Sequence, residues 1–122
     1  MSLDSIRNIC LALPHATEQV QWGDDLVFKI AGKMFCVATL EPPLRFSFKC
    51  TPERFAELTE IEGIIPAPYM ARNFWVSIIR PDALAGGEVK ELLRNSYHLV
   101  LARLPKRKQA ELSAKKSVPK RR

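Results

Sequence analysis

The sequence predicts an α+β sandwich of two layers, in which an antiparallel sheet is covered on one face by an N-terminal helix and a long C-terminal helix. The first observation is Val27–Leu40, where two runs rich in Val, Ile and Phe flank Gly32, a residue that readily takes the positive φ of a tight hairpin turn. The second is Leu44–Lys49, which alternates apolar and polar residues as a strand with one buried face does. Together these segments predict a three-stranded meander with basic side chains on its polar face.

Three helices are predicted around this meander. The first is predicted because its apolar residues recur at the spacing of one buried stripe. Ser2 or Asp4 caps its start, and Pro14 ends it. The second begins after Thr51, which precedes a proline at the first helical position. The longest runs from about Glu88 to Leu104 and is predicted to lie on the sheet. Its core-facing side chains are Val89, Leu92, Leu93, Ser96, Tyr97, Val100 and Leu104.

One or two further strands are predicted in Ile64–Ile79. Two prolines confine the first part to an edge or an irregular extended segment, whereas Phe74–Ile79 has the composition of a strand. His15–Asp25 is interpreted as a polar connector with a turn, and its Trp22 is predicted to pack on the edge of the core. The element order is therefore helix, three strands, helix, one or two strands, and a long helix.

The length and charge distribution predict one α+β domain at residues 1–108 and a basic, flexible tail at residues 109–122. Eight of the 19 Lys and Arg residues lie in residues 106–122, together with the single acid Glu111. Residues 1–105 carry eleven basic and twelve acidic side chains, so the folded body is nearly neutral. The net charge of +6 therefore belongs to the C-terminal end and does not describe a basic domain.

The cysteines and the apolar runs bear on the cellular compartment. Cys10, Cys36 and Cys50 are an odd number without C-x-x-C spacing, which favours buried, reduced thiols. No apolar run approaches the ~20 residues that span a bilayer, and the first residues lack the order of a secretory signal. We therefore expect a cytoplasmic protein, monomeric and without a membrane partner.

The sequence offers little that could support catalysis. The two histidines, His15 and His98, are far apart in the chain, and metal sites and catalytic triads need side chains that converge. The pair Gly86-Gly87 has neither of the spacings that bind phosphates in nucleotide enzymes. The acidic pair Asp24-Asp25 is typical of a turn. We expect no enzymatic activity, no cofactor and no metal.

Short blocks of sequence in a fixed order resemble one family. They are Trp22-Gly23, Phe28-Lys29, Gly32–Phe35, Phe48-Lys49, Pro52-Glu53, Pro66–Met70, Phe74–Val76, Ser96–Val100 and Leu104–Lys106. Over residues 1–108 the chain resembles the MmcQ/YjbR family of small bacterial proteins. The resemblance implies a fold similar to the frataxin/CyaY sandwich and DNA binding through a "double wing" arrangement. Phe74 stands where the family often has His, and the residues beyond Lys108 follow no family pattern.

The frataxin likeness does not carry iron binding with it. Frataxin-type iron sites use an acidic ridge on the first helix and the adjoining strand. Here the first predicted helix has only Asp4 as an acid, so the required cluster is missing and the fold alone does not transfer the function.

The first functional hypothesis is DNA binding through basic residues at the hairpin tip, on the sheet and in the loop before the last strand. A hairpin that presents Lys or Arg can contact phosphates, although the same residues also suit the solvated face of an ordinary sheet. The nearly neutral body argues against tight duplex binding, and the basic end could add non-specific attraction. The candidate residues are Lys29, Lys33, Arg45, Lys49, Arg72, Asn73, Lys106, Arg107 and Lys108.

The alternative hypothesis is a protein-interaction or small-ligand-binding module without a nucleic-acid role. It would use a cleft near Tyr69 and Met70, rimmed by the neighbouring prolines. A contiguous basic face that includes Lys33 and Arg72 would favour DNA, and an apolar cleft beneath Tyr69 would favour the module.

Overall fold

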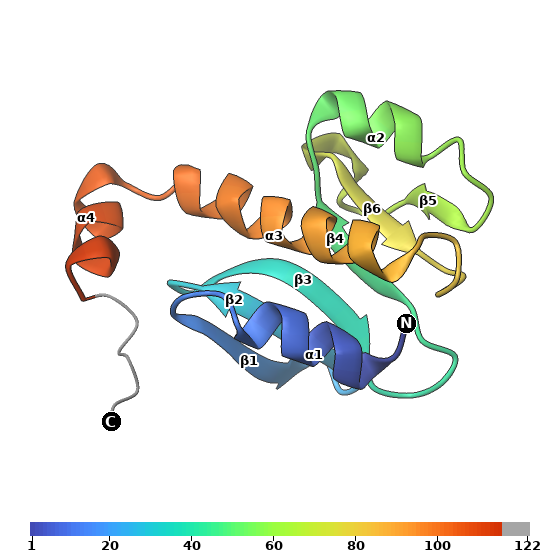
Figure 1. Ribbon diagram of the computed structural model, residues 1–122, viewed down its shortest axis with the longest axis horizontal. Helices are drawn as coiled ribbons and strands as arrows, with labels where there is room; N and C mark the ends of the chain where they lie inside the picture. The colour runs from blue at the N-terminus through green and yellow to red at the C-terminus, as the bar shows by residue number, and fades with distance from the viewer. Residues whose placement is uncertain (116–122) are drawn as a thin grey trace.

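The computed structural model describes residues 1–115, in which helices pack on one six-stranded antiparallel sheet (Figure 1). The strand order is β1-β2-β3-β4-β6-β5. The elements are α1 (Leu3–Leu11), β1 (Ala16–Gln21), β2 (Asp25–Ile30), β3 (Lys33–Thr39), β4 (Phe46–Lys49), α2 (Pro52–Leu58), β5 (Ile64–Pro66), η1 (Ala71–Asn73), β6 (Trp75–Ile78), α3 (Gly86–Ala102) and α4 (Lys106–Lys115). This order confirms the predicted α+β class.

The predicted hairpin is formed by β2 and β3. Ala31 and Gly32 connect the strands, and both have positive φ, at 52° and 80°. A two-residue turn with both φ values positive matches the twist of the flanking strands. In β4, Phe46 and Phe48 are buried and Ser47 is only partly covered, as the alternation predicts.

The helix ends follow the capping residues in the sequence. Ser2 accepts a hydrogen bond from the Ser5 amide at 3.1 Å, and Thr51 accepts one from the Arg54 amide at 3.2 Å. The long helix α3 contacts β3 and β4, and Figure 1 shows it crossing the molecule above them. All seven side chains predicted to face the core from this helix and its end are buried.

Four phenylalanines form the centre of the core. Phe28, Phe35, Phe46 and Phe48 are fully buried and contribute from β2, β3 and β4. Truncating a buried phenylalanine to alanine typically costs about 3–5 kcal/mol, so these residues dominate the stability of the sheet. The three cysteines are also buried and carry free thiols, as predicted.

The segment predicted as a polar connector is partly a strand. Residues 16–21 form β1, which pairs along its length with β2 at the edge of the sheet. Trp22 and Gly23, with φ of 54° and 86°, make a second tight turn. Trp22 is therefore held in a hairpin turn and is 66% exposed, so its predicted place on the core edge is wrong.

The predicted boundary between domain and tail falls inside a helix. Residues 109–115 belong to α4, which begins at Lys106. Gln109 Nε2 donates hydrogen bonds to the carbonyl oxygens of Ala102 and Leu104, at 3.3 and 2.8 Å. These contacts attach the charged helix to the end of α3, which a charge count does not predict. The rest of the predicted tail, 116–122, lies outside the described residues.

Within residues 1–115, no helix has the length and apolar character that crossing a bilayer requires.

Candidate anion-binding site

The strands β3 and β4 separate at one end of the sheet. They pair only from Cys36–Phe48 to Ala38–Phe46, although β3 begins at Lys33 and β4 continues to Lys49. On the Lys33 side of the Cys36–Phe48 pair, the described residues of these two strands form no further ladder pair. The sheet is therefore open at this end.

A buried serine of α3 occupies the gap in the ladder. Ser96 Oγ donates a hydrogen bond of 2.7 Å to the Phe35 carbonyl oxygen and accepts one of 2.9 Å from the Lys49 amide. Without Ser96, these two main-chain groups would lose this hydrogen-bond partner, and a buried polar group without a partner destabilises the folded protein. Ser96 thus satisfies both strands while it keeps them apart.

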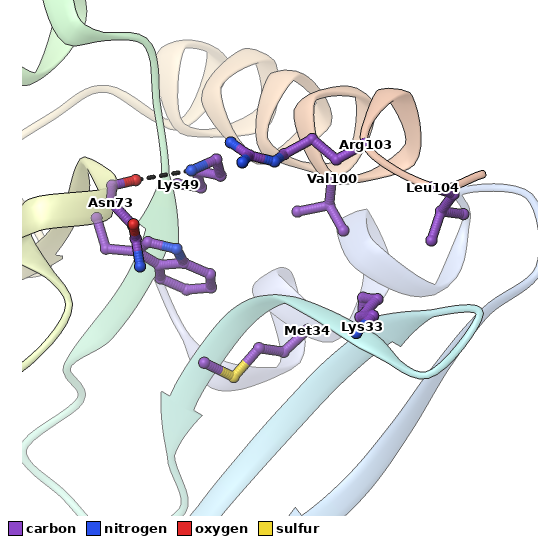
Figure 2. Close-up of a pocket in the computed structure, with 8 residues that line it drawn as sticks. Lys33, Met34, Lys49, Asn73, Val100, Arg103 and Leu104 are labelled. Carbon is purple, nitrogen blue, oxygen red and sulfur yellow. Dashed lines mark hydrogen bonds between the residues drawn. The ribbon is translucent and has the colours of Figure 1, made fainter. Parts of the chain in front are cut away.

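A cavity of about 440 Å³ lies at this opening (Figure 2). Its walls come from the start of β3, the end of β4, the segment before and at the start of β6, and the end of α3. Known small-ligand pockets begin at roughly 300 Å³, so a phosphate with an attached sugar or ring fits the volume. The lining residues are Lys33, Met34, Lys49, Asn73, Trp75, Val100, Arg103 and Leu104.

The charge of this cavity is of one sign. Lys33, Lys49 and Arg103 contribute cations, and no Asp or Glu is among the lining residues. In the part of the chain from 1 to 115, none of the three lies in a salt bridge. Figure 2 shows the Arg103 side chain extending from the end of α3 toward Lys49. The positive charges of Lys49 and Arg103 repel each other, and an anion bound between these two side chains would offset that repulsion.

Burial, and then the charge of Arg103, lower the pKa of Lys49 below its ordinary value, while Cys50 acts in the opposite direction. Both lowering effects disfavour the charged ammonium group. Lys49 Nζ donates a hydrogen bond of 2.7 Å to the Asn73 carbonyl oxygen, which fixes its position. The site therefore holds a partly desolvated cation without a negative partner in the cavity wall, and this arrangement favours anion binding.

The remaining wall is apolar. Trp75 is 6% exposed, and Met34, Val100 and Leu104 complete this side of the cavity. A planar ring beside the phosphate could pack on this wall.

Three of the nine predicted nucleic-acid residues meet at the cavity: Lys33, Lys49 and Asn73. Lys29 is on β2 and donates to Gln19 Oε1 at 3.0 Å, and Lys108 pairs with Glu111 at 3.5 Å. The predicted residues that do not line the cavity are Lys29, Arg45, Arg72, Lys106, Arg107 and Lys108.

Arg103 and the opening itself were missed by the sequence reasoning. A signal for Arg103 existed, because it follows Val100 by three positions and so continues the inner stripe of the last helix. The opening had no such signal, since it depends on where Ser96 meets two strands that are distant in the sequence.

Neither Tyr69 nor Met70, the residues of the alternative site, lines any of five cavities found within residues 1–115. Tyr69 is fully exposed at 101%, so its ring does not cover an apolar cleft.

The two histidines are closer than their sequence separation suggests. His15 and His98 both line a cavity of about 620 Å³ beneath α4. His15 Nε2 donates to the Leu112 carbonyl oxygen at 3.0 Å, and Tyr97 donates to the Pro14 carbonyl oxygen at 2.7 Å, so these groups serve to hold the chain together. In the region the structure covers, no three His, Cys, Asp or Glu side chains are placed to hold a metal ion.

The fold and the site define a small α+β protein with a cationic cavity where two strands of its sheet separate. The family model YjbR matches residues 11–99, and the chain belongs to this family. The resemblance predicted from the sequence blocks is therefore confirmed.

Relatives and solved structures agree with this assignment. The chain is 34% identical to the uncharacterised protein YyaQ of Bacillus subtilis over 53 residues, which is 43% of this chain and 45% of YyaQ. It is 26% identical over 109 residues to the uncharacterised protein YbdF of Escherichia coli O157:H7, covering 87% of this chain and 89% of YbdF.

Two crystal structures are similar in fold. The Deinococcus radiodurans protein DR2400, with a DUF419 domain, has a TM-score of 0.84 and 31% identity, over 92% of this chain and 88% of DR2400. A Pseudomonas syringae protein has a TM-score of 0.67 and 19% identity, over 81% of this chain and 98% of its own.

Proposed function

We propose that the chain binds nucleic acid through its phosphate groups at the opening between β3 and β4, and that it catalyses no reaction. The observation that carries this proposal is the convergence of Lys33, Lys49 and Arg103 on one cavity without a carboxylate in its wall. Phosphate contacts provide position and affinity, whereas base contacts provide sequence specificity.

The three cations differ in what they offer a phosphate. The Arg103 guanidinium has a planar fork that can donate two parallel hydrogen bonds, and the two lysines act as point charges. The Asn73 side chain adds a neutral donor and acceptor at the rim. Because Lys49 is partly buried, its attraction to an anion is stronger than that of a fully solvated lysine.

The nearly neutral body limits the expected affinity. Three neutralised phosphates correspond to a decrease in log K of roughly 2–3 for each tenfold rise in salt. We therefore expect modest binding that is strongest at low salt, with a contribution from the basic C-terminal residues.

Fluorescence anisotropy of a labelled oligonucleotide across a salt series tests the proposal. The double variant Lys49→Gln/Arg103→Gln should weaken binding at low salt and reduce the salt slope by roughly 1.5–2. The matched control is Lys29→Gln, because Lys29 is a cation of the same sheet that does not line the cavity. Thermal melting establishes that each variant is folded.

A further variant separates the cavity from the C-terminal cluster. The C-terminal cluster consists of Lys120, Arg121 and Arg122. The variant Lys120→Gln/Arg121→Gln/Arg122→Gln removes these three positive charges and leaves the residues that line the cavity unsubstituted. If this variant loses all binding and the cavity variant loses none, the opening is not the nucleic-acid site.

The cavity supports a second candidate function, the binding of a small phosphorylated ligand. Its volume of about 440 Å³ and the apolar wall formed by Trp75, Val100 and Leu104 favour this candidate. Competition distinguishes the two, because a mononucleotide that displaces the labelled strand at micromolar concentration would favour the small ligand.

A further inference from the structure

Tyr69 is presented to solvent by a turn that ordinarily favours glycine. The Met70 amide donates to the Ala67 carbonyl oxygen at 3.1 Å, which closes a four-residue turn with Pro68 and Tyr69 at its centre. Tyr69 has a φ of 68°, and a proline followed by a residue with positive φ defines a type II turn. A bulky aromatic residue is strained at this position.

The tyrosine ring does nothing for the fold that would explain this strain. It is completely exposed, and no aromatic pair among the described residues includes it. Glycine at position 69 would take the same backbone conformation without strain. The side chain is therefore available for contact with a molecule outside the chain.

The loop that carries Tyr69 is also a wall of the cationic cavity. The Ala67 amide donates to the Trp75 carbonyl oxygen at 2.9 Å, and the Asn73 amide donates to the Met70 carbonyl oxygen at 3.1 Å, so the loop is held at its base and across its middle. Its Asn73 lines the cavity and accepts the hydrogen bond from Lys49. One hydrogen-bonded loop thus links an exposed aromatic ring to the site proposed for phosphates.

We propose that the nucleic acid bound here is single-stranded, with an unpaired base stacked on the Tyr69 ring while neighbouring phosphates bind Lys49, Arg103 and Lys33. This inference rests on the proposed function and adds the class of nucleic acid. Aromatic platforms beside a cationic groove are the usual means of binding single strands, because every unpaired base exposes a flat face. In a duplex, both faces of an internal base are covered by its neighbours in the stack, so an exposed ring gains little.

The chain provides a matched control for Tyr69. Trp22 is also an exposed aromatic residue with positive φ in a tight turn, at 66% exposure. Its turn joins β1 and β2 at the end where Asp25 pairs with Thr39, whereas Lys33 lies at the opposite end of the β2–β3 hairpin. Substitution of Trp22 therefore tests exposed aromatic character in general, away from the cavity.

The experiment measures the anisotropy of a labelled oligothymidylate and of a labelled duplex with the full chain and its variants. Tyr69→Gly should weaken single-strand binding by roughly 5- to 100-fold, which is the range for losing one stacked base, and should leave duplex binding unchanged. Tyr69→Phe should keep the affinity, and Trp22→Gly should not alter it. The melting temperature of Tyr69→Gly should be equal to or above that of the unsubstituted chain, because glycine removes the backbone strain of a bulky residue at positive φ.

The outcomes separate this inference from the proposed function. If Tyr69→Gly binds the single strand normally, or if duplex and single strand lose affinity equally, the inference is overturned. The proposed function stands in that case, provided that Lys49→Gln/Arg103→Gln still weakens binding. If the double variant binds as well as the unsubstituted chain, or if neither oligonucleotide binds, both are overturned.

Discussion

Lys49 donates a hydrogen bond of 2.7 Å from Nζ to the carbonyl oxygen of Asn73, and this contact joins the end of β4 to the loop before β6. The main chain of Lys49 is held separately, by the hydroxyl of Ser96. One residue is thus fixed at both its backbone and its ammonium group. The result is a cation held in place at the edge of a cavity, where a flexible lysine would otherwise be free to move into solvent.

Ser96→Ala should destabilise the protein by roughly 2–4 kcal/mol, because it leaves the Phe35 carbonyl and the Lys49 amide without their shared partner. Urea denaturation measures this change. Ser113→Ala is the control, since Ser113 is an exposed serine on α4 and its loss should change stability by less than about 0.5 kcal/mol. Equal stabilities for the two variants would show that the bridge has no structural importance.

The pKa of Lys49 should respond to its charged surroundings. Arg103→Gln removes one of the two causes that lower this pKa and should therefore raise it, although burial still holds it below its ordinary value. Bound oligonucleotide should raise it as well, because an anion favours the charged form. NMR titration of the lysine side-chain signals measures both effects. A pKa that stays the same in the variant would place Arg103 too far from Lys49 to matter.

The lowered pKa of Lys49 also predicts the sign of one pH effect on stability. Between the folded and the unfolded pKa values, the unfolded chain binds the Lys49 proton more strongly. Stability from this group should therefore increase as the pH rises through that window, and should be constant below it. Comparing denaturation curves of the unsubstituted chain and of Lys49→Met over this range isolates the effect, and a decrease with rising pH would contradict it.

Cys50 should be unreactive in the native protein. Burial raises its pKa to about 11, against the smaller opposing effects of Arg54 and Lys49. At pH 7 only about one thiol in 10,000 is then ionised, and the thiolate is the reactive form. Ellman's reagent should modify the cysteines only after unfolding. Rapid modification of one thiol in the folded chain would show that the site is more open than the structure indicates.

Gln109→Ala should loosen α4 without unfolding the sheet. Its side chain makes the hydrogen bonds to the Ala102 and Leu104 carbonyl oxygens, each of which is worth about 0.5–1.5 kcal/mol. Hydrogen exchange should become faster in residues 106–115 and remain slow in β2, β3 and β4. Unchanged protection of α4 would mean that other contacts hold this helix.

The sequence predicted those parts of the fold that are determined locally. The hairpin was evident from Gly32, and β4 from the alternation that places Phe46 and Phe48 inside. The inner face of α3 followed from the helical repeat. In each case the spacing of apolar residues or the chemistry of a turn was sufficient.

The parts that were missed depend on contacts between distant residues. The edge strand β1 has polar residues at most positions, and only its pairing with β2 identifies it as a strand. The charged helix α4 is stabilised by Gln109 and by the contact of His15 with Leu112. For the site, strand alternation indicated that Lys49 faces away from the core, but not where β3 leaves β4. The meeting of Lys33, Lys49 and Arg103 at one cavity could therefore not be predicted.

An NMR titration of the labelled full chain with a single-stranded oligonucleotide locates the bound nucleic acid residue by residue. We expect the largest amide shift changes at Lys33, Lys49, Asn73 and Arg103, with further changes in the loop of Tyr69. Unchanged amides at these positions, together with saturable shifts at the β1–β2 turn or along α4, would show that nucleic acid does not bind at the cationic opening.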